Sequence, residues 1–266
     1  MNITGNVFVV TGAGNGIGRE VTRILLASGA SVAGVDLNES TLAATAALVA
    51  AGSRFSSHVV DITSRDEVLA LPAAVLTEHG QIDGLVNIAG VIQKFVKIID
   101  LPFEEIEKVM NVNFWGTVNM VKAFLPILVE RPEASLVNVA SMGAYAPVPG
   151  QAVYGASKAA VRLLTEALYA ELLDTNVSVT SIFPGAIATD IATNSGVALS
   201  EGSSTDAPAF KMTTATDAGN AIVAAIRKGS FRATIGKDAA AMDKLARLSP
   251  KHAARTIAKQ MGSLLS

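Results

Sequence analysis

The chain has 266 residues, no cysteine and a formal net charge of −2 at pH 7. Without cysteine, disulfides, thiolate nucleophiles and Cys-ligated zinc are excluded; this composition suits a reducing cytoplasm, which is the location we expect. The small net charge gives no reason to expect nucleic acid as a partner. Hydrophobic residues make up 50% of the chain and aromatic residues 5%, so the core must consist of Ala, Val, Ile and Leu. That is typical of parallel strands covered by helices on both faces.

The N-terminal sequence MNITGNVFVVTG lacks a basic region followed by a long apolar run, so we expect no signal peptide. No segment offers about 18 consecutive uncharged apolar residues, so we expect no transmembrane segment. The length fits one large α/β domain, and neither a composition break nor a repeat marks a second one. We therefore predict a single domain over residues 1–266.

Short β-branched runs alternate with Ala- and Leu-rich helical patterns along the chain. Such alternation predicts one parallel sheet with right-handed crossovers. The strands are predicted at residues 7–11, 31–36, 55–60, 84–87, 135–139, 177–183 and 231–235. The helices are predicted at residues 16–27, 39–50, 65–79, 102–129, 154–173 and 217–227.

The first strand runs into the first helix through the glycine-rich sequence TGAGNGIG. Its spacing matches T-G-x-x-x-G-x-G through Gly12, Gly16 and Gly18, and not G-x-G-x-x-G, because Ile17 occupies the place of the third glycine. Glycines at such a turn let the backbone approach a pyrophosphate, which the helix N-terminus stabilises. A tight turn is the structural alternative, but the position after the first strand favours a nucleotide site.

The second predicted strand ends at Asp36, 18 residues after Gly18. A carboxylate there accepts hydrogen bonds from the adenosine ribose hydroxyls and repels a 2′-phosphate, which favours NAD over NADP. Asn15 within the loop adds no positive charge, whereas Arg19 just beyond it weakens the argument. The alternative is that Asp36 is an acid near the N-terminus of the following helix, stabilised by the helix dipole.

Further polar residues follow later strands. The sequence NIAG, at residues 87–90, ends the fourth strand, Asn113 lies in the long helix after it, and Ser141 follows the fifth strand. Tyr154 and Lys158, in YGASK, are four residues apart, so they share one helix face at roughly 5–6 Å between Cβ atoms. Each alone has an ordinary explanation as a cap or surface residue. Together they point to a ligand crevice at the carboxyl ends of the strands.

With these motifs in this order, the sequence resembles the single-domain branch of the short-chain dehydrogenase/reductase family. The resemblance runs from Thr11 to about Thr189 and includes TGAGNGIG, Asp61-Ile62, NIAG, Asn113, Ser141, YGASK and PGAIAT at Pro184–Thr189. It implies an α/β fold with a doubly wound, seven-stranded parallel Rossmann-type sheet. It also implies a dimer or tetramer and a catalytic tetrad of Asn113, Ser141, Tyr154 and Lys158.

The motifs and the resemblance together suggest a set of cofactor contacts, with NAD favoured over NADP. The family implies Asp61 at the adenine, residues 87–90 along the cofactor, and Thr189 near the carboxamide or the phosphates. The predicted contacts are Gly12, Asn15, Gly16, Ile17, Gly18, Asp36, Leu37, Asp61, Ile62, Asn87, Ala89, Gly90, Tyr154, Lys158, Pro184, Gly185, Ile187 and Thr189.

The chemistry required of Tyr154 fits a lysine neighbour. A free phenol has a pKa near ~10, so a base working close to neutrality needs a drop of about two to three units, or roughly 3–4 kcal/mol. An ammonium at ~4 Å supplies about 4 kcal/mol at an effective dielectric near 20. We therefore expect Tyr154 to exchange the proton, Ser141 to orient the substrate oxygen and Lys158 to bind the nicotinamide ribose. Asn113 is expected to hold a water that passes the proton outward.

The substrate contacts are predicted at Ser141, Met142, Gln151 and Tyr154. Their neighbours in sequence are mostly apolar and uncharged, which favours a neutral, fairly lipophilic secondary alcohol or ketone. One alternative is an NADPH-dependent 3-oxoacyl reductase of the acyl-carrier-protein type, although Asn15 stands where those enzymes often carry a basic residue. A second is a catalytically silent, nucleotide-binding regulator.

Two segments fall outside these motifs. Residues 190–212, rich in Ser, Thr, Ala and Gly, are predicted to form a substrate lid. Residues 237–266 form a basic tail, with six Lys or Arg against two Asp between Lys237 and Lys259. Ser249–Pro250 predicts a helix start there. Packing on the body or on a neighbouring subunit is preferred over peripheral contact with an anionic membrane. The tail's apolar positions are Ala254, Ile257, Ala258, Met261, Leu264 and Leu265.

His58, His79 and His252 are scattered without the spacing that metal ligands require. We therefore predict that the chain has no metal site.

Overall fold

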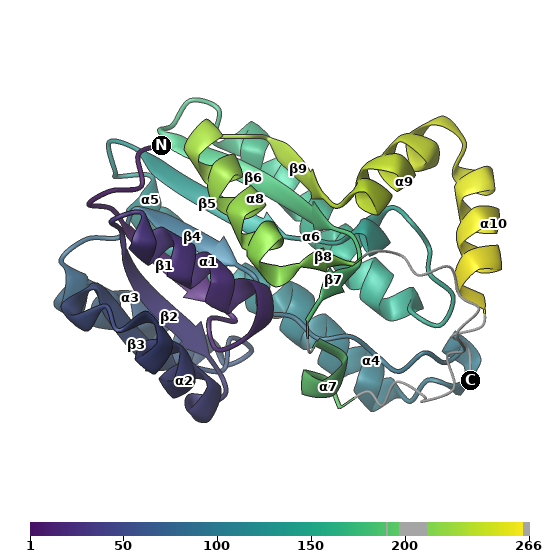
Figure 1. Cartoon of the computed structure of the whole chain (residues 1–266), viewed down its shortest axis with the longest axis horizontal. Helices are drawn as coiled ribbons and strands as arrows, with labels where there is room; N and C mark the ends of the chain where they lie inside the picture. Colours follow the sequence, from purple (N-terminus) through teal and green to yellow (C-terminus); the bar gives the residue numbers. More distant parts are fainter. Residues whose placement is uncertain (190, 197–211, 263–266) are drawn as a thin grey trace.

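The computed structural model describes residues 1–189, 191–196 and 212–262. At its centre lies a seven-stranded parallel sheet with the strand order β3-β2-β1-β4-β5-β6-β9 (Figure 1). The order reverses between β1 and β4, which confirms the predicted doubly wound sheet and places a ligand crevice at their carboxyl ends. The strands are β1 (Val7–Thr11), β2 (Ser31–Asp36), β3 (Phe55–Val59), β4 (Gly84–Asn87), β5 (Ala134–Val139), β6 (Val177–Pro184) and β9 (Arg232–Ile235).

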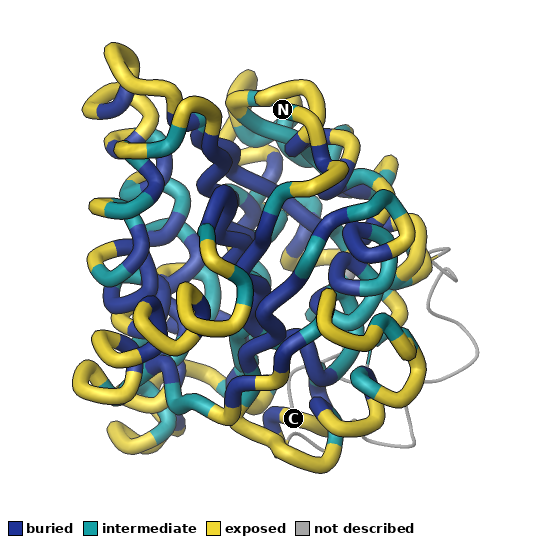
Figure 2. The backbone as a smooth tube through the Cα atoms, turned by 90° about the vertical axis from the view of Figure 1, so that its left-hand side faces the viewer, coloured by how far each residue is buried: buried dark blue, intermediate teal, exposed yellow. Residues whose placement is uncertain are grey.

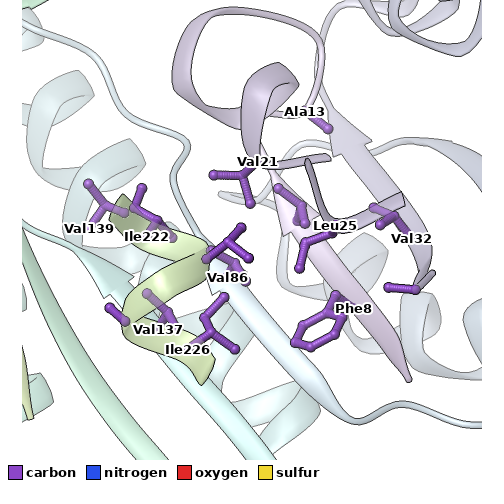
Figure 3. Close-up of a cluster of buried hydrophobic side chains, with 14 of the residues drawn as sticks. Phe8, Ala13, Val21, Leu25, Val32, Val86, Val137, Val139, Ile222 and Ile226 are labelled. Carbon is purple, nitrogen blue, oxygen red and sulfur yellow. The ribbon is translucent and has the colours of Figure 1, made fainter. Parts of the chain in front are cut away.

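Helices cover both faces of the sheet, and each face has its own apolar cluster. Aliphatic side chains of α1 and α8 pack on one face, where Figure 3 shows Leu25, Val86 and Ile222 converging. Figure 2 shows the buried strands at the centre and the exposed outer turns of the helices around them. On the first face lie α1 (Gly16–Ala27), α2 (Glu39–Val49) and α8 (Ala215–Lys228); on the second lie α3 (Arg65–His79), α5 (Thr117–Leu128) and α6 (Ala152–Glu171).

The long helix predicted over residues 102–129 is not uniform. The structure has α4 (Phe103–Met110), a π-helical turn (Asn111–Gly116) and then α5. The widened turn contains Asn113, whose side chain bonds the backbone of Val91. It also contains Gly116, where a Cβ would lie 2.6 Å from the side chain of Ile62. Both contacts are made with residues far away in the chain, so helical periodicity alone does not indicate the π-turn. Such turns are frequent at functional sites.

The predicted lid begins and ends at a small parallel pair of strands. Ile187–Ala188 (β7) pairs with Thr213–Thr214 (β8), and α7 (Ile191–Asn194) follows β7. Most of the predicted lid, residues 190 and 197–211, lies outside the described residues. Short 3₁₀ turns occur at Gly52–Arg54, Ile98–Asp100 and Met142–Ala144.

The tail forms two helices, α9 (Lys237–Leu248) and α10 (Pro250–Met261). Three contacts fix α9 to the body. The Asp238 carboxylate accepts from the N–H of Ala186 (2.7 Å), the Tyr145 hydroxyl donates to the carbonyl of Ala239 (3.0 Å), and Arg232 pairs with Asp243 (2.9 Å). Helix α9 therefore packs on the body of the same chain, which was one of the two interpretations preferred for the tail.

Helix α10 begins at Pro250, as predicted, although the Ser249 side chain makes no capping bond. Its buried side chains are Ala253 and Ile257, while Ala258, one of the predicted apolar positions, is exposed. Leu264 and Leu265 lie outside the described residues. Among the residues that the structure describes, no helix has both the length and the apolar character needed to cross a membrane.

Candidate active site

The turn after β1 is built from close approaches of backbone to backbone. Gly12 and Gly16 have φ of +69° and +49°, the region that favours glycine. A Cβ on Gly18 would lie 2.0 Å from the carbonyl oxygen of Gly12, and one on Gly12 would lie 3.1 Å from the amide nitrogen of Ala89. Asn15 caps α1 by accepting from the N–H of Gly16 (2.7 Å). The turn therefore lies directly against the segment that follows β4.

The opposite wall of this crevice is the segment that precedes the predicted lid. A Cβ on Gly16 would lie 3.3 Å from Cγ2 of Thr189, so these two predicted cofactor contacts are brought together. Between them runs a groove of about 530 Å³, lined by Asn15, Gly16, Arg19, Glu20, Ala188, Thr189, Met212, Ala215 and Thr216. Backbone without side chains, placed at a helix N-terminus beside such a groove, fits the pyrophosphate of a dinucleotide.

Asp36 lies at the carboxyl end of β2, beside this turn. Its carboxylate accepts from the N–H groups of Gly14 (2.9 Å) and Asn38 (3.0 Å). Arg19 lies at the same edge, where Nε donates to the Thr45 hydroxyl (2.9 Å) and Nη2 donates to the carbonyl of Gly14. The acid is thus fixed by the loop, and the arginine is tied to the loop and to α2. Leu37, the next predicted contact, is 68% exposed.

Asp61 and Ile62 follow β3. Asp61 Oδ1 accepts from both the N–H and the hydroxyl of Thr63 (2.8 Å each), so its carboxylate also closes its own turn. The side chain of Ile62 is buried in the core, and its carbonyl accepts from Asn119 (3.0 Å). Of the two, Asp61 is the more accessible to a ligand.

The segment after β4 is held by side chains from neighbouring strands. The Thr11 hydroxyl accepts from the N–H groups of Ile88 (2.9 Å) and Ala89 (3.1 Å). Asn87 Nδ2 donates to Asn138 Oδ1 (2.8 Å), while Asn87 Oδ1 is buried without a partner. Thr11 belongs to the motif TGAGNGIG, but it was not among the predicted cofactor contacts. Only its position next to the glycines indicated that it supports the site.

The four residues of the predicted tetrad gather at one place. A Cβ on Gly90 would lie 3.0 Å from Asn113 Oδ1 and 3.1 Å from Lys158 Nζ. Tyr154 is hydrogen-bonded to Ser141, whose hydroxyl also accepts from the N–H of Gly143 (3.0 Å). The structure therefore places the amide and the ammonium at the end of the NIAG segment, and the phenol and the hydroxyl together beside Gly143.

Burial affects both titratable groups of the predicted tetrad. It raises the pKa of Tyr154, and the hydrogen bond with Ser141 opposes that rise in part. Burial also lowers the pKa of Lys158 to about 8. Lys158 Nζ donates to the carbonyl of Val139 (3.0 Å). Desolvation is thus the largest influence on both groups in the protein without cofactor.

The amide of Asn113 is fully engaged by the protein. Its Oδ1 accepts from the N–H of Val91 (2.8 Å), and its Nδ2 donates to the carbonyl of Val91 and to the Ser157 hydroxyl (3.0 Å each). Both amide hydrogens are therefore committed to the protein, and the backbone carbonyl of Asn113 accepts from the Thr117 hydroxyl (2.8 Å), so the water expected at Asn113 stays a prediction. Ser157, within YGASK, was not singled out from the sequence.

The predicted substrate contacts lie on both sides of Tyr154. Met142 opens the 3₁₀ turn after Ser141 and is partly buried. Gln151 is 5% exposed; its Nε2 donates to the carbonyl of Gln93 (2.7 Å), and its Oε1 is buried without a partner. Gln93 itself was missed from the sequence, where nothing distinguished it from a loop glutamine.

The PGAIAT segment contributes unequally to the crevice. Pro184 is buried at the end of β6, and Ile187 packs against the apolar cluster of the first face. A Cβ on Gly185 would lie 2.2 Å from Asp238, so Gly185 faces α9. Among the described residues, no group of three or more His, Cys, Asp or Glu is placed to hold a metal ion.

Comparisons with known proteins identify the family of this chain. The family model for short chain dehydrogenases matches residues 6–198. The chain is 37% identical over 261 residues to the putative oxidoreductase SadH of Mycobacterium tuberculosis, covering 96% of this chain and 94% of that one.

Two solved structures of similar shape are a short-chain dehydrogenase/reductase from Burkholderia phymatum in complex with NAD and a 3-ketoacyl-(acyl-carrier-protein) reductase from Brucella melitensis complexed with NADH. The first has a TM-score of 0.85 at 27% identity and covers 96% of this chain and 97% of that one. The second has a TM-score of 0.78 at 26% identity and covers 88% and 97%. The chain therefore belongs to the short-chain dehydrogenase/reductase family.

Proposed function

We propose that this protein transfers a hydride between NAD(H) and a neutral, fairly lipophilic secondary alcohol or ketone. The observation that carries the proposal is that Asn113 and Lys158 meet at Gly90, beside the glycine turn, while Tyr154, on the same helix as Lys158, pairs with Ser141. The nicotinamide, when bound, supplies the hydride donor or acceptor. The chain's own residues have to orient the substrate oxygen and move its proton.

In this proposal Tyr154 exchanges the proton with the substrate oxygen, and Ser141 orients that oxygen through its hydroxyl. Burial raises the pKa of Tyr154, so the phenol keeps its proton at neutral pH. It is therefore suited, in the protein as described, to donate a proton to a carbonyl. Alcohol oxidation needs a lower phenol pKa, which the Lys158 ammonium and a cationic nicotinamide would supply together.

The preference for NAD rests on Asp36. Its carboxylate is fixed next to the glycine turn, where it would accept from ribose hydroxyls and repel a 2′-phosphate. The positive charge of Arg19 would favour NADP. Its Nε and Nη2 donate, however, to the Thr45 hydroxyl and to the carbonyls of Gly14 and Thr41. The two solved relatives described above contain NAD and NADH, which supports the same cofactor.

The substrate class rests on the predominantly apolar lining predicted around Tyr154, including Met142, Val91 and Ile92. The likeness to a 3-ketoacyl-(acyl-carrier-protein) reductase favours one second candidate, an acyl-thioester ketone as substrate. A panel containing plain ketones and acetoacetyl thioesters separates the two, because only the second function requires the thioester.

Tyr154→Phe tests the reaction. The variant should lose at least ~100-fold in turnover of the best alcohol or ketone, because proton transfer by a positioned side chain contributes 10²–10⁴-fold. Its Kd for NADH should stay within about threefold of the original. Unchanged turnover would overturn the role of Tyr154, and NADH binding without any turnover across the panel would favour a regulatory protein.

Titration with NADH and NADPH, followed by nicotinamide fluorescence, tests the cofactor. NADH should bind at least ~10-fold tighter, a difference of about 1.4 kcal/mol. Asp36→Ala should remove the preference. Equal or tighter binding of NADPH would reject this account of Asp36 and leave Arg19 as the residue that selects the phosphate.

The dimer or tetramer implied by the family remains a prediction. It is supported by an apolar groove of about 350 Å³ on α5 and α6, lined by Val118, Val121, Lys122, Leu125, Pro126, Val129, Leu164 and Leu168. Light scattering after size exclusion should give at least twice the chain mass of 27.4 kDa. A monomer would contradict the prediction.

A further inference from the structure

The helix that carries Tyr154 begins without a cap of its own. Gln151 stands at the N-cap of α6 but makes no side-chain capping bond, and the first turn contains no acidic residue. In most helices the N-cap side chain accepts from the second or third N–H of the helix. Here those N–H groups belong to Val153 and Tyr154 itself, so another segment has to provide the acceptor.

Gln93, in the loop that follows the NIAG segment, provides it. Its Oε1 accepts from the N–H groups of Val153 (3.0 Å) and Tyr154 (2.9 Å), and its Nε2 donates to the carbonyl of Gly150 (3.0 Å). The side chain is fully buried, with 0% exposure. Gln151 Nε2 donates back to the carbonyl of Gln93 (2.7 Å), which ties the two glutamines together.

Gln93 also ends a run of three residues that each bind a different part of the site. Val91 is bonded through both its N–H and its carbonyl to the amide of Asn113. The N–H of Ile92 donates to the Ser195 hydroxyl (3.0 Å), next to α7 at the start of the predicted lid. Val91, Ile92 and Gln93 therefore connect the π-turn, the start of the predicted lid and the helix that carries Tyr154.

We propose that Gln93 is a positioning residue for Tyr154, and that the neutrality of its amide is required. This inference rests on the proposed function. A carboxylate at residue 93 would accept from the same two N–H groups and would suit the helix dipole. It would, however, place a negative charge one hydrogen bond away from the backbone N–H of Tyr154, and that charge would oppose formation of the phenolate.

The experiment compares Gln93→Met, which removes the acceptor, with Gln93→Glu, which keeps it and adds charge. Gln81→Met is a control for the loss of a glutamine amide, because Gln81 Nε2 also donates to a backbone carbonyl, that of Gly5 (3.0 Å), at the amino end of the strands. For each variant we would measure amide exchange at Val153 and Tyr154 by NMR, the phenol titration by ultraviolet difference against Tyr154→Phe, and kcat and KM against pH.

Gln93→Met should speed exchange at both amides at least ~10-fold and lower kcat at least ~10-fold, with the Kd for NADH within threefold. Gln93→Glu should keep both amides protected, yet it should move the phenol titration and the pH profile of kcat to higher pH by about one unit. Gln81→Met should change neither the exchange at these amides nor the pH profile.

The readouts separate this inference from the proposed function. If the original chain turns over no alcohol or ketone, the proposed function fails, while amide exchange and the phenol titration still decide the role of Gln93. If turnover is present and Gln93→Met keeps the original kcat, Gln93 is only structural and the inference is overturned. An unshifted phenol titration and pH profile in Gln93→Glu would reject the requirement for neutrality.

Discussion

The glycine turn after β1 and the start of α6 both belong to the candidate site, and they are built in different ways. The glycine turn after β1 depends on backbone approaching backbone, as between Gly18 and Gly12. The start of α6 depends on side chains reaching in from other segments, as Gln93 does toward Val153 and Tyr154. The first construction leaves a local motif in the sequence, whereas the second leaves almost none. The comparison shows why a dinucleotide turn is easier to recognise than the support of a catalytic helix.

The largest effect is expected from breaking the glycine turn. Gly18→Ala places a Cβ about 2.0 Å from the Gly12 carbonyl oxygen, and because that oxygen belongs to the backbone, the turn has to move. NADH binding should weaken at least ~100-fold, about 2.8 kcal/mol, as measured by fluorescence titration. Gly262→Ala is the control, since a Cβ there meets no atom of the described residues within 4 Å. If Gly18→Ala bound NADH normally, the turn would not be the cofactor cradle.

A substitution near the start of α6 is expected to stabilise the fold, because the buried charge of Lys158 destabilises it. Burial lowers the pKa of Lys158 to about 8, so its charged form is disfavoured in the folded state. The penalty is complete below pH 8 and disappears as the pH rises toward the unfolded lysine value of about 10.4. Lys158→Met should therefore raise the free energy of unfolding at pH 7 by up to about 3 kcal/mol, while abolishing activity.

Urea unfolding at pH 7 and pH 10 would measure this difference. The gap between Lys158→Met and the original chain should be wide at pH 7 and narrow at pH 10. Lys108→Met, at an exposed position of α4, should behave like the original chain at both values. A variant less stable than the original at pH 7 would mean that the bond from Lys158 to the Val139 carbonyl outweighs the cost of burying the charge.

The smallest effect is expected in β3 and α3, at acidic pH. Ser56 on β3 contacts Nε2 of both His58 and His79 (2.8 Å each), and burial lowers the pKa of both histidines. Since the neutral forms are favoured in the fold, their stabilising contribution is present above the unfolded value of about 6.5 and is lost below it, as the pH falls through the lowered pKa values of the folded state.

A double variant, His58→Gln with His79→Gln, should therefore lose less stability than the original chain between pH 7 and pH 5, as measured by the urea midpoint. His252→Gln, on the exposed side of α10, should follow the original curve. Identical curves for all three proteins would show that this histidine pair carries no share of the acid sensitivity. The β3–α3 side would then respond to pH no differently from the rest of the fold.

Several predicted elements agree with the structure to the residue, and the misses have a common cause. The helix over Gly16–Ala27 begins and ends as predicted, because the glycines and the cap at Asn15 are local signals. The helix predicted over residues 102–129 contains a π-turn, because Asn113 bonds Val91, 22 residues earlier in the chain. The pairing of β7 with β8 was missed for the same reason, since two-residue strands carry no periodicity.

The candidate site divides in the same way. Tyr154 and Lys158 are four residues apart on one helix, so the sequence alone brings them together. Burial raises the pKa of the phenol, whereas its lowering by the Lys158 ammonium stays a prediction. A sequence shows which charges are near in the chain, but not how much water the fold removes from them.

By itself, the sequence determined the alternation of strands and helices, the glycine turn and the order of the motifs, because each depends on neighbours along the chain. Only the tertiary structure decided which polar atoms became partners. Thr11 supports the segment after β4, Gln93 caps α6, and Asp238 fixes the loop after β6. Buried polar groups must find hydrogen-bond partners, and which atom lies within about 3 Å is set by the packing of distant segments.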